Sequence, residues 1–247
     1  MKGRCPRHRA AHDVAKEHHW LPRLAPSLPV AVPGPLGKGA PAEGYPWQWS
    51  VYRWLDGETP DPGRLSAPHA LAVDLAEFIT ALHRIDAADG PPSYRSESLA
   101  ARDQATRAAV AELPGLVDTD AAIAAWEAAL QAPAWPGPAV WIHADLQPGN
   151  LLTARGRLGA VIDFGCLGLG DPAVDLIVAW YLLPADVRGA FRTALGADDA
   201  TWARGRGWAL SIALSELRYY RDTNPVMAAL ARQVIEEVRI EHAQAAV

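Results

Sequence analysis

The sequence predicts an α+β fold, in which a small mixed segment precedes helices, a compact group of strands and further helices. Three observations support this class: bulky and polar residues alternate at 47–55, a helical periodicity begins at Pro68, and three short strand-like pieces lie within residues 139–163. Strands and helices therefore occupy separate stretches instead of alternating as βαβ units. The 247 residues suffice for one large domain or for two lobes that share a cleft.

The start of the chain is expected to form a small mixed unit. A short helix is predicted at residues 11–21 and should stop near Pro22. Residues 26–46 are rich in proline and glycine, with one strand-like piece around residues 30–32. The stretch "WQWSVYRWL" at 47–55 then has the alternation of a strand.

A break in this pattern, "DGETPDPG" at 56–63, is the expected boundary between a first lobe, residues 1–55, and a second lobe, residues 56–247. Apolar residues recur at three- and four-residue spacing from Leu71 to Ile85 and predict a helix with one buried face. Further expected elements are helices near 97–112 and 119–131, the strand-like pieces "AVWIH", "NLLTA" and "LGAVID", and helices at about 172–183, 185–195, 199–221 and 225–243, the last one capped by Asn224.

Composition argues against several classes of protein. The formal net charge of −5 is unfavourable for a surface that binds nucleic acid. The longest apolar run, "LIVAWYLL" at 176–183, is far shorter than the roughly 18 residues that cross a bilayer. Cys5 and Cys166 are too few for a disulfide framework and are interpreted as free thiols of a reducing compartment. We therefore expect a cytoplasmic protein without a nucleic-acid or membrane partner, whose oligomeric state the sequence leaves open.

Polar groups gather in the strand cluster. The stretch "WIHADLQPGNLL" places His143, Asp145 and Asn150 among apolar residues, and "VIDFG" places Asp163 directly after another apolar run. Each motif alone is common, but both in this order, with an Asn shortly after the first Asp, form a rarer pattern. This combination indicates a functional site.

Phosphoryl transfer requires residues of these types. A carboxylate accepts the proton of the attacking hydroxyl, and further oxygen ligands hold Mg²⁺ against the nucleotide phosphates. Asp145 fits the base, whereas Asn150 and Asp163 fit the metal ligands. His143 is expected to be structural, as a packed imidazole.

These motifs resemble the aminoglycoside phosphotransferase family, a branch of the protein-kinase-like fold that phosphorylates small molecules. The resemblance rests on "IHADLQPGNLL", "AVIDFGCLGLGDPAVDLIVAW" and "YPWQWSVYRWLDGE" and extends over about residues 4 to 240. It implies a two-lobed fold with a mostly helical second lobe, and transfer of the γ-phosphate of ATP or GTP, with Mg²⁺, to a hydroxyl of a small molecule. Gln147, where protein Ser/Thr kinases usually have Lys, favours this branch over the protein kinases.

The resemblance also implies roles outside the two motifs. Asp175 matches an Asp that braces the catalytic loop. Arg4 matches a basic residue that grips the phosphates, and Glu17 matches the helix Glu that pairs with it. Arg4 as a plain terminal residue and Glu17 as a solvated carboxylate remain the alternatives. Residues Arg53, Trp54 and Leu55 match the hinge, where backbone groups meet the adenine edge.

The Gly-rich hairpin of this family has no counterpart before Arg4, so the first lobe is expected to be shortened by two strands. Two other glycine clusters, "GPLGKG" at 34–39 and "GCLGLG" at 165–170, are expected to be loops and not phosphate cradles. The start would then lie further upstream, or the gene would be truncated. In the second case the alternative function is an impaired kinase-like remnant that at most binds a partner.

The acceptor remains open between an aminoglycoside-like compound and another metabolite such as choline, homoserine, a sugar or a macrolide. In the family the helical last third forms the substrate wall. The stretch "ELRYYRDTNP" is the first candidate for this wall, although charged residues at helical spacing are more often a solvated face. The candidate residues are Glu216, Tyr219, Tyr220 and Asp222, with Glu236 and Glu237 further along.

Overall fold

A computed structural model describes residues 7–245, and its helices and short strands follow the order expected of an α+β chain. The elements are α1 (Arg7–Leu24), β1 (Pro35–Gly39), β2 (Trp49–Tyr52), α2 (Pro68–His83), α3 (Asp103–Ala111), α4 (Thr119–Leu130), β3 (Val140–Ile142), β4 (Leu151–Ala154), β5 (Arg157–Val161), β6 (Gly168–Gly170), α5 (Val178–Tyr181), α6 (Ala185–Leu195), α7 (Asp199–Tyr220) and α8 (Pro225–Ala245).

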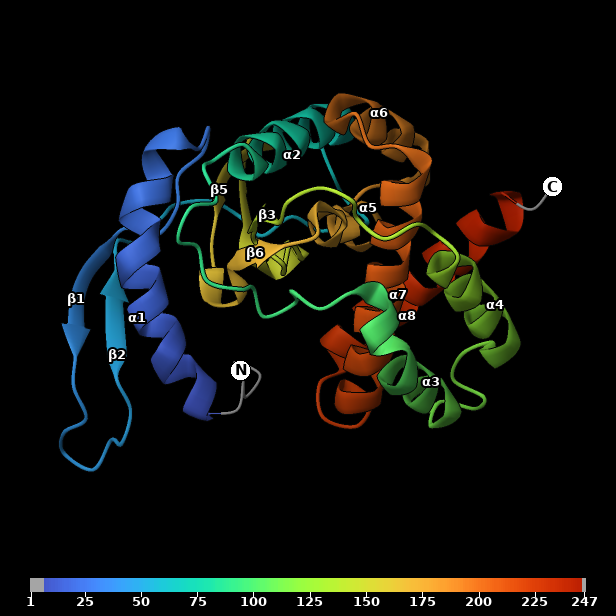
Figure 1. Ribbon diagram of the computed structural model, residues 1–247, viewed down its shortest axis with the longest axis horizontal. Coiled ribbons are helices and arrows are strands. Elements are labelled where there is room, and N and C mark those ends of the chain that lie inside the picture. The colour runs from blue at the N-terminus through green and yellow to red at the C-terminus, as the bar shows by residue number, and fades with distance from the viewer. Residues whose placement is uncertain (1–6, 246–247) are drawn as a thin grey trace.

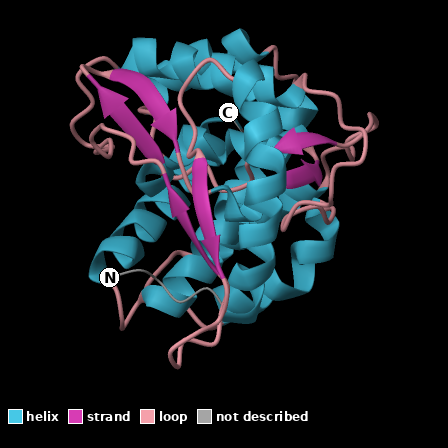
Figure 2. Cartoon of the chain, turned by 90° about the vertical axis from the view of Figure 1, so that its left-hand side faces the viewer, coloured by secondary structure: helices cyan, strands magenta, loops and turns pink. Residues whose placement is uncertain are grey.

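The strands form separate antiparallel pairs, β1 with β2, β3 with β6 and β4 with β5, in the part of the chain that is described. Figure 1 shows α1 and the β1–β2 hairpin at one end of the molecule, and α3, α4, α7 and α8 toward the other. The strand pairs appear among the helices in Figure 2. The strands next to the two polar motifs therefore lie between the end formed by α1, β1 and β2 and the end formed by α3, α4, α7 and α8.

The β1–β2 hairpin packs one face against α1. Ser50 Oγ lies 2.5 Å from His18 Nε2, and the Tyr52 hydroxyl donates to the Glu17 carboxylate. Strand residues alternate between faces, so Trp49 and Val51 point the other way and are about half exposed. The alternation expected at 47–55 is thus confirmed over β2, although both of its faces are only partly covered.

The start of the chain differs from expectation in two places. Helix α1 continues through Pro22 to Leu24, because Leu21 and Leu24 are both buried and their packing outweighs a proline in the last turn. The "GPLGKG" stretch is not a loop, since residues 35–39 form β1. A Cβ at Gly39 would lie 1.9 Å from the Trp49 ring, so a larger residue there would displace the indole.

The strand-like piece expected at residues 30–32 is only an isolated bridge. Ala31 N donates to Gly159 O (3.2 Å) and Val161 N donates to Ala31 O (3.0 Å), in parallel register. This short contact connects the first part of the chain to β5.

Helix α2 confirms the periodicity of the sequence, and α6 packs against it. The apolar face of α2 is fully buried, as expected from the three- and four-residue spacing of its apolar residues. Ile85 follows the end of the helix and is half-buried. The buried members of the predicted set are Leu71, Leu75, Phe78, Ile79 and Leu82.

Helix α7 is the central helix of the second lobe and contacts α3, α4 and α8. Two glycines allow its neighbours to approach closely, because a Cβ at Gly205 would lie 2.8 Å from Leu176, in the 3₁₀ turn before α5, and one at Gly207 would lie 2.7 Å from Ala129 of α4. The single helix expected at 172–183 is instead a 3₁₀ turn, Pro172–Ile177, followed by the short α5.

Two smaller expectations about the second lobe have clear outcomes. Asn224 caps α8 as expected, through Oδ1, which accepts from Met227 N at 3.2 Å. The "GCLGLG" stretch is partly a strand, β6, whereas a loop was expected.

Cys166 is a free thiol, and Cys5 lies outside the described residues. Among residues 7–245, none of the helices combines the length and apolar character that crossing a bilayer requires.

An ion pair ties α2 to the β4–β5 hairpin. Asp74 accepts from Arg157 Nε at 2.7 Å and Nη2 at 2.5 Å, and from Leu158 N at 3.0 Å. The bonds from Arg157 hold the pKa of Asp74 below its ordinary value, and the Leu158 N–H acts in the same direction. Asp74 itself is almost fully buried, whereas Arg157 is largely exposed.

We expect Asp74→Asn to lower the free energy of unfolding by about 1–3 kcal/mol at pH 7, because it weakens charge-assisted hydrogen bonds. A carboxyl whose folded-state pKa is lowered adds stability above its unfolded-state pKa near ~3.9 and loses it as the pH falls through the folded value. The difference in the free energy of unfolding between the parent and Asp74→Asn, measured by urea unfolding, should therefore be smaller at pH 3 than at pH 7. Asp89→Asn, at an exposed aspartate, is the control; an equal loss in both variants would contradict this account.

Candidate active site

The β4–β5 hairpin brings Asn150 and Asp163 to the same end. Leu151 pairs with Val161, and Ile162 N donates to Asn150 O at 2.9 Å, so the residues just outside the hairpin lie together. Asp163 has a left-handed backbone (φ 62°, ψ 69°) and is exposed. The turn at the opposite end is made by Arg155 and Gly156, both with positive φ, as two-residue hairpin turns require.

The loop after β3 holds Asp145. His143 is fully buried, and its ring packs edge-on against Phe164 with centroids 4.6 Å apart. His143 Nδ1 accepts from Asp145 N (3.2 Å), so Nε2 carries the hydrogen that is donated to Ile162 O (3.1 Å). The imidazole thus joins the Asp145 loop to the strand end that precedes Asp163.

The buried carboxylate of Asp175 also holds the loop after β3. It accepts from His143 N at 3.1 Å, from Ala144 N at 2.7 Å and from His83 Nε2 at 3.1 Å. Ala144 has φ 65°, a conformation that non-glycine residues seldom adopt. The two backbone N–H groups point to one carboxylate in this conformation, which fits the bracing position that the sequence predicts for Asp175.

The carboxylate of Asp145 is held on both oxygens. Asn150 Nδ2 donates to Asp145 Oδ2 at 3.1 Å and to its backbone O at 2.7 Å. Arg95 Nη1 lies 3.2 Å from Oδ1, and Gln147 Nε2 is a longer donor at 3.4 Å. The Asp145 side chain keeps 26% of its surface exposed, which leaves room for a substrate.

Arg95 was missed by sequence reasoning. It lies in the polar loop between α2 and α3, far from both motifs in the chain, and a single arginine in such a loop carries no recognisable signal. Its contact with Asp145 is visible only once the fold is known.

Glu216 reaches the catalytic loop from α7. Gln147 Nε2 donates to Glu216 Oε1 at 2.6 Å, and the Tyr181 hydroxyl donates to Oε2 at 2.7 Å. Burial raises the pKa of Glu216 above its ordinary value, and the negative charge of Asp145 acts in the same direction. Glu216 is therefore no solvated helix residue but part of the cluster around Asp145.

The other candidates for the acceptor wall do not join this cluster. Tyr219 is 61% exposed, and its ring packs edge-on against Tyr220. Asp222 is exposed and pairs with its neighbour Arg221 at 3.3 Å. Glu236 and Glu237 are likewise engaged in ion pairs, with Arg239 and Arg188 respectively.

Helix α1 contacts the turn that follows Asp163. Lys16 Nζ donates to Gly165 O at 2.6 Å, and the carboxylate of the next residue, Glu17, accepts from the Tyr52 hydroxyl. Burial raises the pKa of Glu17 to about 7, with smaller contributions from Asp163, while the Tyr52 bond opposes the rise. Arg4, the expected partner of Glu17, lies outside the described residues.

The expected hinge follows β2 directly. Arg53 N donates to Gly34 O at 2.8 Å, the Trp54 side chain is 86% exposed, and Leu55 is half-buried. The indole of Trp54 is thus neither core nor covered by other described residues.

The donor set fits a magnesium ion that takes further ligands from phosphates. The amide NH₂ of Asn150 is occupied by Asp145, so its Oδ1 faces another direction and is left for a ligand. The Asp163 carboxylate is exposed at the same hairpin end. No cluster of three or more His, Cys, Asp or Glu ligands occurs in the described part of the chain. Mg²⁺ characteristically binds one or two protein groups besides phosphates and water.

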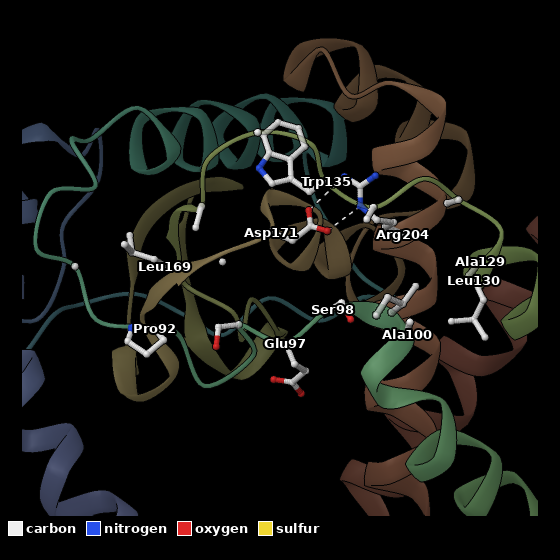
Figure 3. A pocket seen from close by; sticks show the side chains of 18 residues that line it. Pro92, Glu97, Ser98, Ala100, Ala129, Leu130, Trp135, Leu169, Asp171 and Arg204 are labelled. Carbon is white, nitrogen blue, oxygen red and sulfur yellow. Dashed lines mark hydrogen bonds and ion pairs between the residues drawn. The ribbon is translucent and has the colours of Figure 1, made fainter.

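A separate cavity of about 720 Å³ lies between the loop at 90–100 and the segment at 129–139 (Figure 3). Trp135, Leu169 and several alanines line it, but none of the residues of the Asp145 cluster does. Its polar groups are paired within the protein, since Asp171 accepts from Arg204 Nε at 2.7 Å and Trp135 Nε1 donates to Pro138 O. We therefore place the candidate active site at Asp145 and not in this cavity.

Comparison with known proteins gives a family and a fold. A model described as "Phosphotransferase enzyme family" matches residues 4–208. No curated protein matches the chain. The GDP and kanamycin complex of APH(2″)-IIIa matches with a TM-score of 0.72 and 21% identity, over 94% of this chain and 84% of that one.

Two further solved structures are similar. ADP-bound APH(2″)-Ib has a TM-score of 0.60 and 16% identity, over 94% of this chain and 83% of that one. Macrolide 2′-phosphotransferase MphH from Brachybacterium faecium has a TM-score of 0.58 and 23% identity, over 92% and 80%. These similarities confirm the expected fold class, a kinase-like α+β fold with a mostly helical C-terminal part.

We expect Asp175→Ala to lower the free energy of unfolding by about 2–6 kcal/mol, because two buried N–H groups lose their acceptor at about 1–3 kcal/mol each. Amide exchange of residues 143–145 should accelerate in the folded protein. The matched control is Asp198→Ala, which removes a helix cap that accepts one hydrogen bond, from Thr201 N. This variant should lower the free energy of unfolding by about 1 kcal/mol. Unchanged exchange at 143–145 in Asp175→Ala would show that the carboxylate does not hold the loop.

Without nucleotide, Glu17→Gln should become more stable than the parent as the pH rises. A carboxyl with a folded pKa near 7 adds stability below its unfolded value near 4.5, and this contribution is lost as the pH rises through 7. Thermal unfolding at pH 5 and pH 8.5 measures the change. Glu43→Gln, at an exposed turn, should show none; a pH-independent difference for Glu17→Gln would refute the assignment.

Proposed function

The chain belongs to the phosphotransferase enzyme family, and from this premise we propose that it transfers the γ-phosphate of ATP or GTP to a hydroxyl of a small molecule. The observation that carries the proposal is the Asp145 carboxylate, held on both oxygens beside the hairpin end that bears Asn150 and Asp163. Phosphoryl transfer depends mainly on positioning and on charge neutralisation, and this arrangement supplies both.

Asp145 is the base of the proposed reaction. The acceptor hydroxyl lies against the exposed part of its carboxylate and donates its proton as the oxygen attacks the γ-phosphorus. His143 and Asp175 hold the loop in position, as their hydrogen bonds to its backbone indicate. The freed nucleoside diphosphate is the leaving group.

Asn150 Oδ1 and the Asp163 carboxylate would hold Mg²⁺. When bound, the ion neutralises charge that builds on the phosphoryl oxygens. Asn150 then serves two groups at once, since its NH₂ holds Asp145 while its oxygen is left for the metal.

The nucleotide is proposed to lie between a first lobe, residues 1–55, and a second lobe, residues 56–247, with its adenine or guanine edge at Arg53–Leu55. Arg4 and Glu17 belong to its phosphate side in this proposal. The Lys16 contact with Gly165 supports it, because it places α1 beside the turn after Asp163. Similar structures contain GDP and ADP.

The acceptor is proposed to be a hydroxyl-bearing compound such as an aminoglycoside or a macrolide, because one similar structure is a kanamycin complex and another is named a macrolide 2′-phosphotransferase. Glu216 is the best-supported contact, because it reaches the Asp145 loop through Gln147. Tyr219 and Tyr220, at the end of α7, and Asp222, just after it, are proposed as further contacts to the acceptor. We propose that the reaction takes place in the cytoplasm.

We expect Asp145→Asn and Asp163→Asn each to lower phosphate transfer at least about 100-fold, because the first lacks the base and the second a metal ligand. Release of the nucleoside diphosphate and mass spectrometry of an acceptor panel that includes kanamycin and a macrolide measure the transfer. Calorimetry should separate the roles: Asp163→Asn weakens the binding of Mg²⁺–nucleotide, whereas Asp145→Asn retains it.

Asp186→Asn, at an exposed position of α6, is the control and should leave both quantities unchanged. Parental activity in the Asp145→Asn and Asp163→Asn variants would overturn the assigned roles. A parent that binds no Mg²⁺–nucleotide would overturn the proposed function itself.

A further inference from the structure

Arg95 is the cationic side chain that contacts the proposed base. Its side chain is 12% exposed, and Nη1 donates both to Ala144 O and to Asp145 Oδ1, the latter at 3.2 Å. One nitrogen therefore bonds the backbone of the catalytic loop and the carboxylate next to it. Neither contact follows from the two sequence motifs.

The same loop is fastened to the segment that follows Asp163. Ser93 Oγ donates to Cys166 O at 2.8 Å, Ser93 N donates to Leu169 O at 2.9 Å, and Tyr94 N donates to Cys166 O at 3.3 Å. Ser93 Oγ also accepts from Arg95 N at 3.2 Å, which holds the backbone of Arg95 in place. A continuous set of hydrogen bonds thus runs from residues 166–169 to the base.

We infer that Arg95 is a positioning residue of the proposed reaction, which sets the orientation of the Asp145 carboxylate and links it to the segment after the metal ligand Asp163. The inference rests on the proposed function for its kinetic meaning. Asn150 holds Oδ2 and Arg95 holds Oδ1, so the carboxylate is fixed against rotation about its last bond.

A guanidinium suits this position better than an ammonium would. Its planar group offers donors in fixed directions, so one nitrogen can meet a carbonyl and a carboxylate at once. Burial lowers the pKa of Arg95, but the charge of Asp145 raises it, with Cys166 and Glu216 acting in the same direction, and the result is a pKa above the ordinary value. A lysine would retain the charge but not the fixed geometry.

The test uses the full chain with Arg95→Ala, Arg95→Lys and the control Arg102→Gln. Arg102 is a half-buried arginine of the next turn that bonds Glu97 and Ser211 and does not contact the catalytic loop. The activity probe is the release of ADP from Mg²⁺–ATP and of GDP from Mg²⁺–GTP, with kanamycin or water as acceptor. Hydrogen exchange of residues 143–147, read by mass spectrometry, reports the loop without requiring turnover.

For Arg95→Ala we expect faster exchange at residues 143–147 and a kcat lowered about 100-fold, with an unchanged KM for the nucleotide, because a small misplacement of a reacting group has this effect. Millimolar guanidinium should restore part of the kcat of Arg95→Ala, and Arg95→Lys should lie between this variant and the parent. Arg102→Gln should match the parent in both readouts.

Unchanged exchange in Arg95→Ala would overturn the link to the loop. An unchanged kcat, or a raised KM with no change in kcat, would overturn the positioning role even where exchange is faster. A parent that binds neither Mg²⁺–ATP nor Mg²⁺–GTP would instead remove the proposed function, and faster exchange alone would then reduce Arg95 to a structural contact.

Discussion

The geometry of the site depends on one buried carboxylate. Asp175 accepts two backbone N–H groups of the loop after β3 and the ring N–H of His83, with no exposed surface of its own. A carboxylate in the interior is unfavourable unless such donors satisfy it, and the loop supplies them in the conformation in which the Asp145 side chain remains partly exposed. The hydrogen bonds that satisfy Asp175 and the conformation of the loop that carries Asp145 are therefore linked.

The remaining parts of the site derive from backbone pairing. The register of the β4–β5 hairpin places Asn150 next to the residue before Asp163, and the His143 imidazole bonds that same strand end. Side chains of the outer elements then meet this frame, Lys16 from α1 and Glu216 from α7. A rigid strand end surrounded by contacts from several helices is the usual way in which a site is held in position.

Sequence reasoning predicted most of the second lobe and the proposed catalytic residues, because both follow from local patterns. The apolar periodicity from Leu71 to Leu82 identifies a helix that buries one face, and the motifs place Asp145, Asn150 and Asp163 at strand ends. The extension of α1 past Pro22 and the contact of Arg95 were missed, since both depend on packing between distant segments. Local propensity carries no information about such contacts.

The backbone of Ala144 has a consequence for how this loop tolerates change. With φ at 65°, alanine here carries a conformational strain of about 1 kcal/mol or more that glycine would relieve. Glycine would also give the unfolded chain more freedom, which costs about 0.4–1 kcal/mol of stability. The two effects have opposite signs. What alanine supplies is stiffness, because it has fewer alternative conformations into which the loop can relax when a substrate arrives.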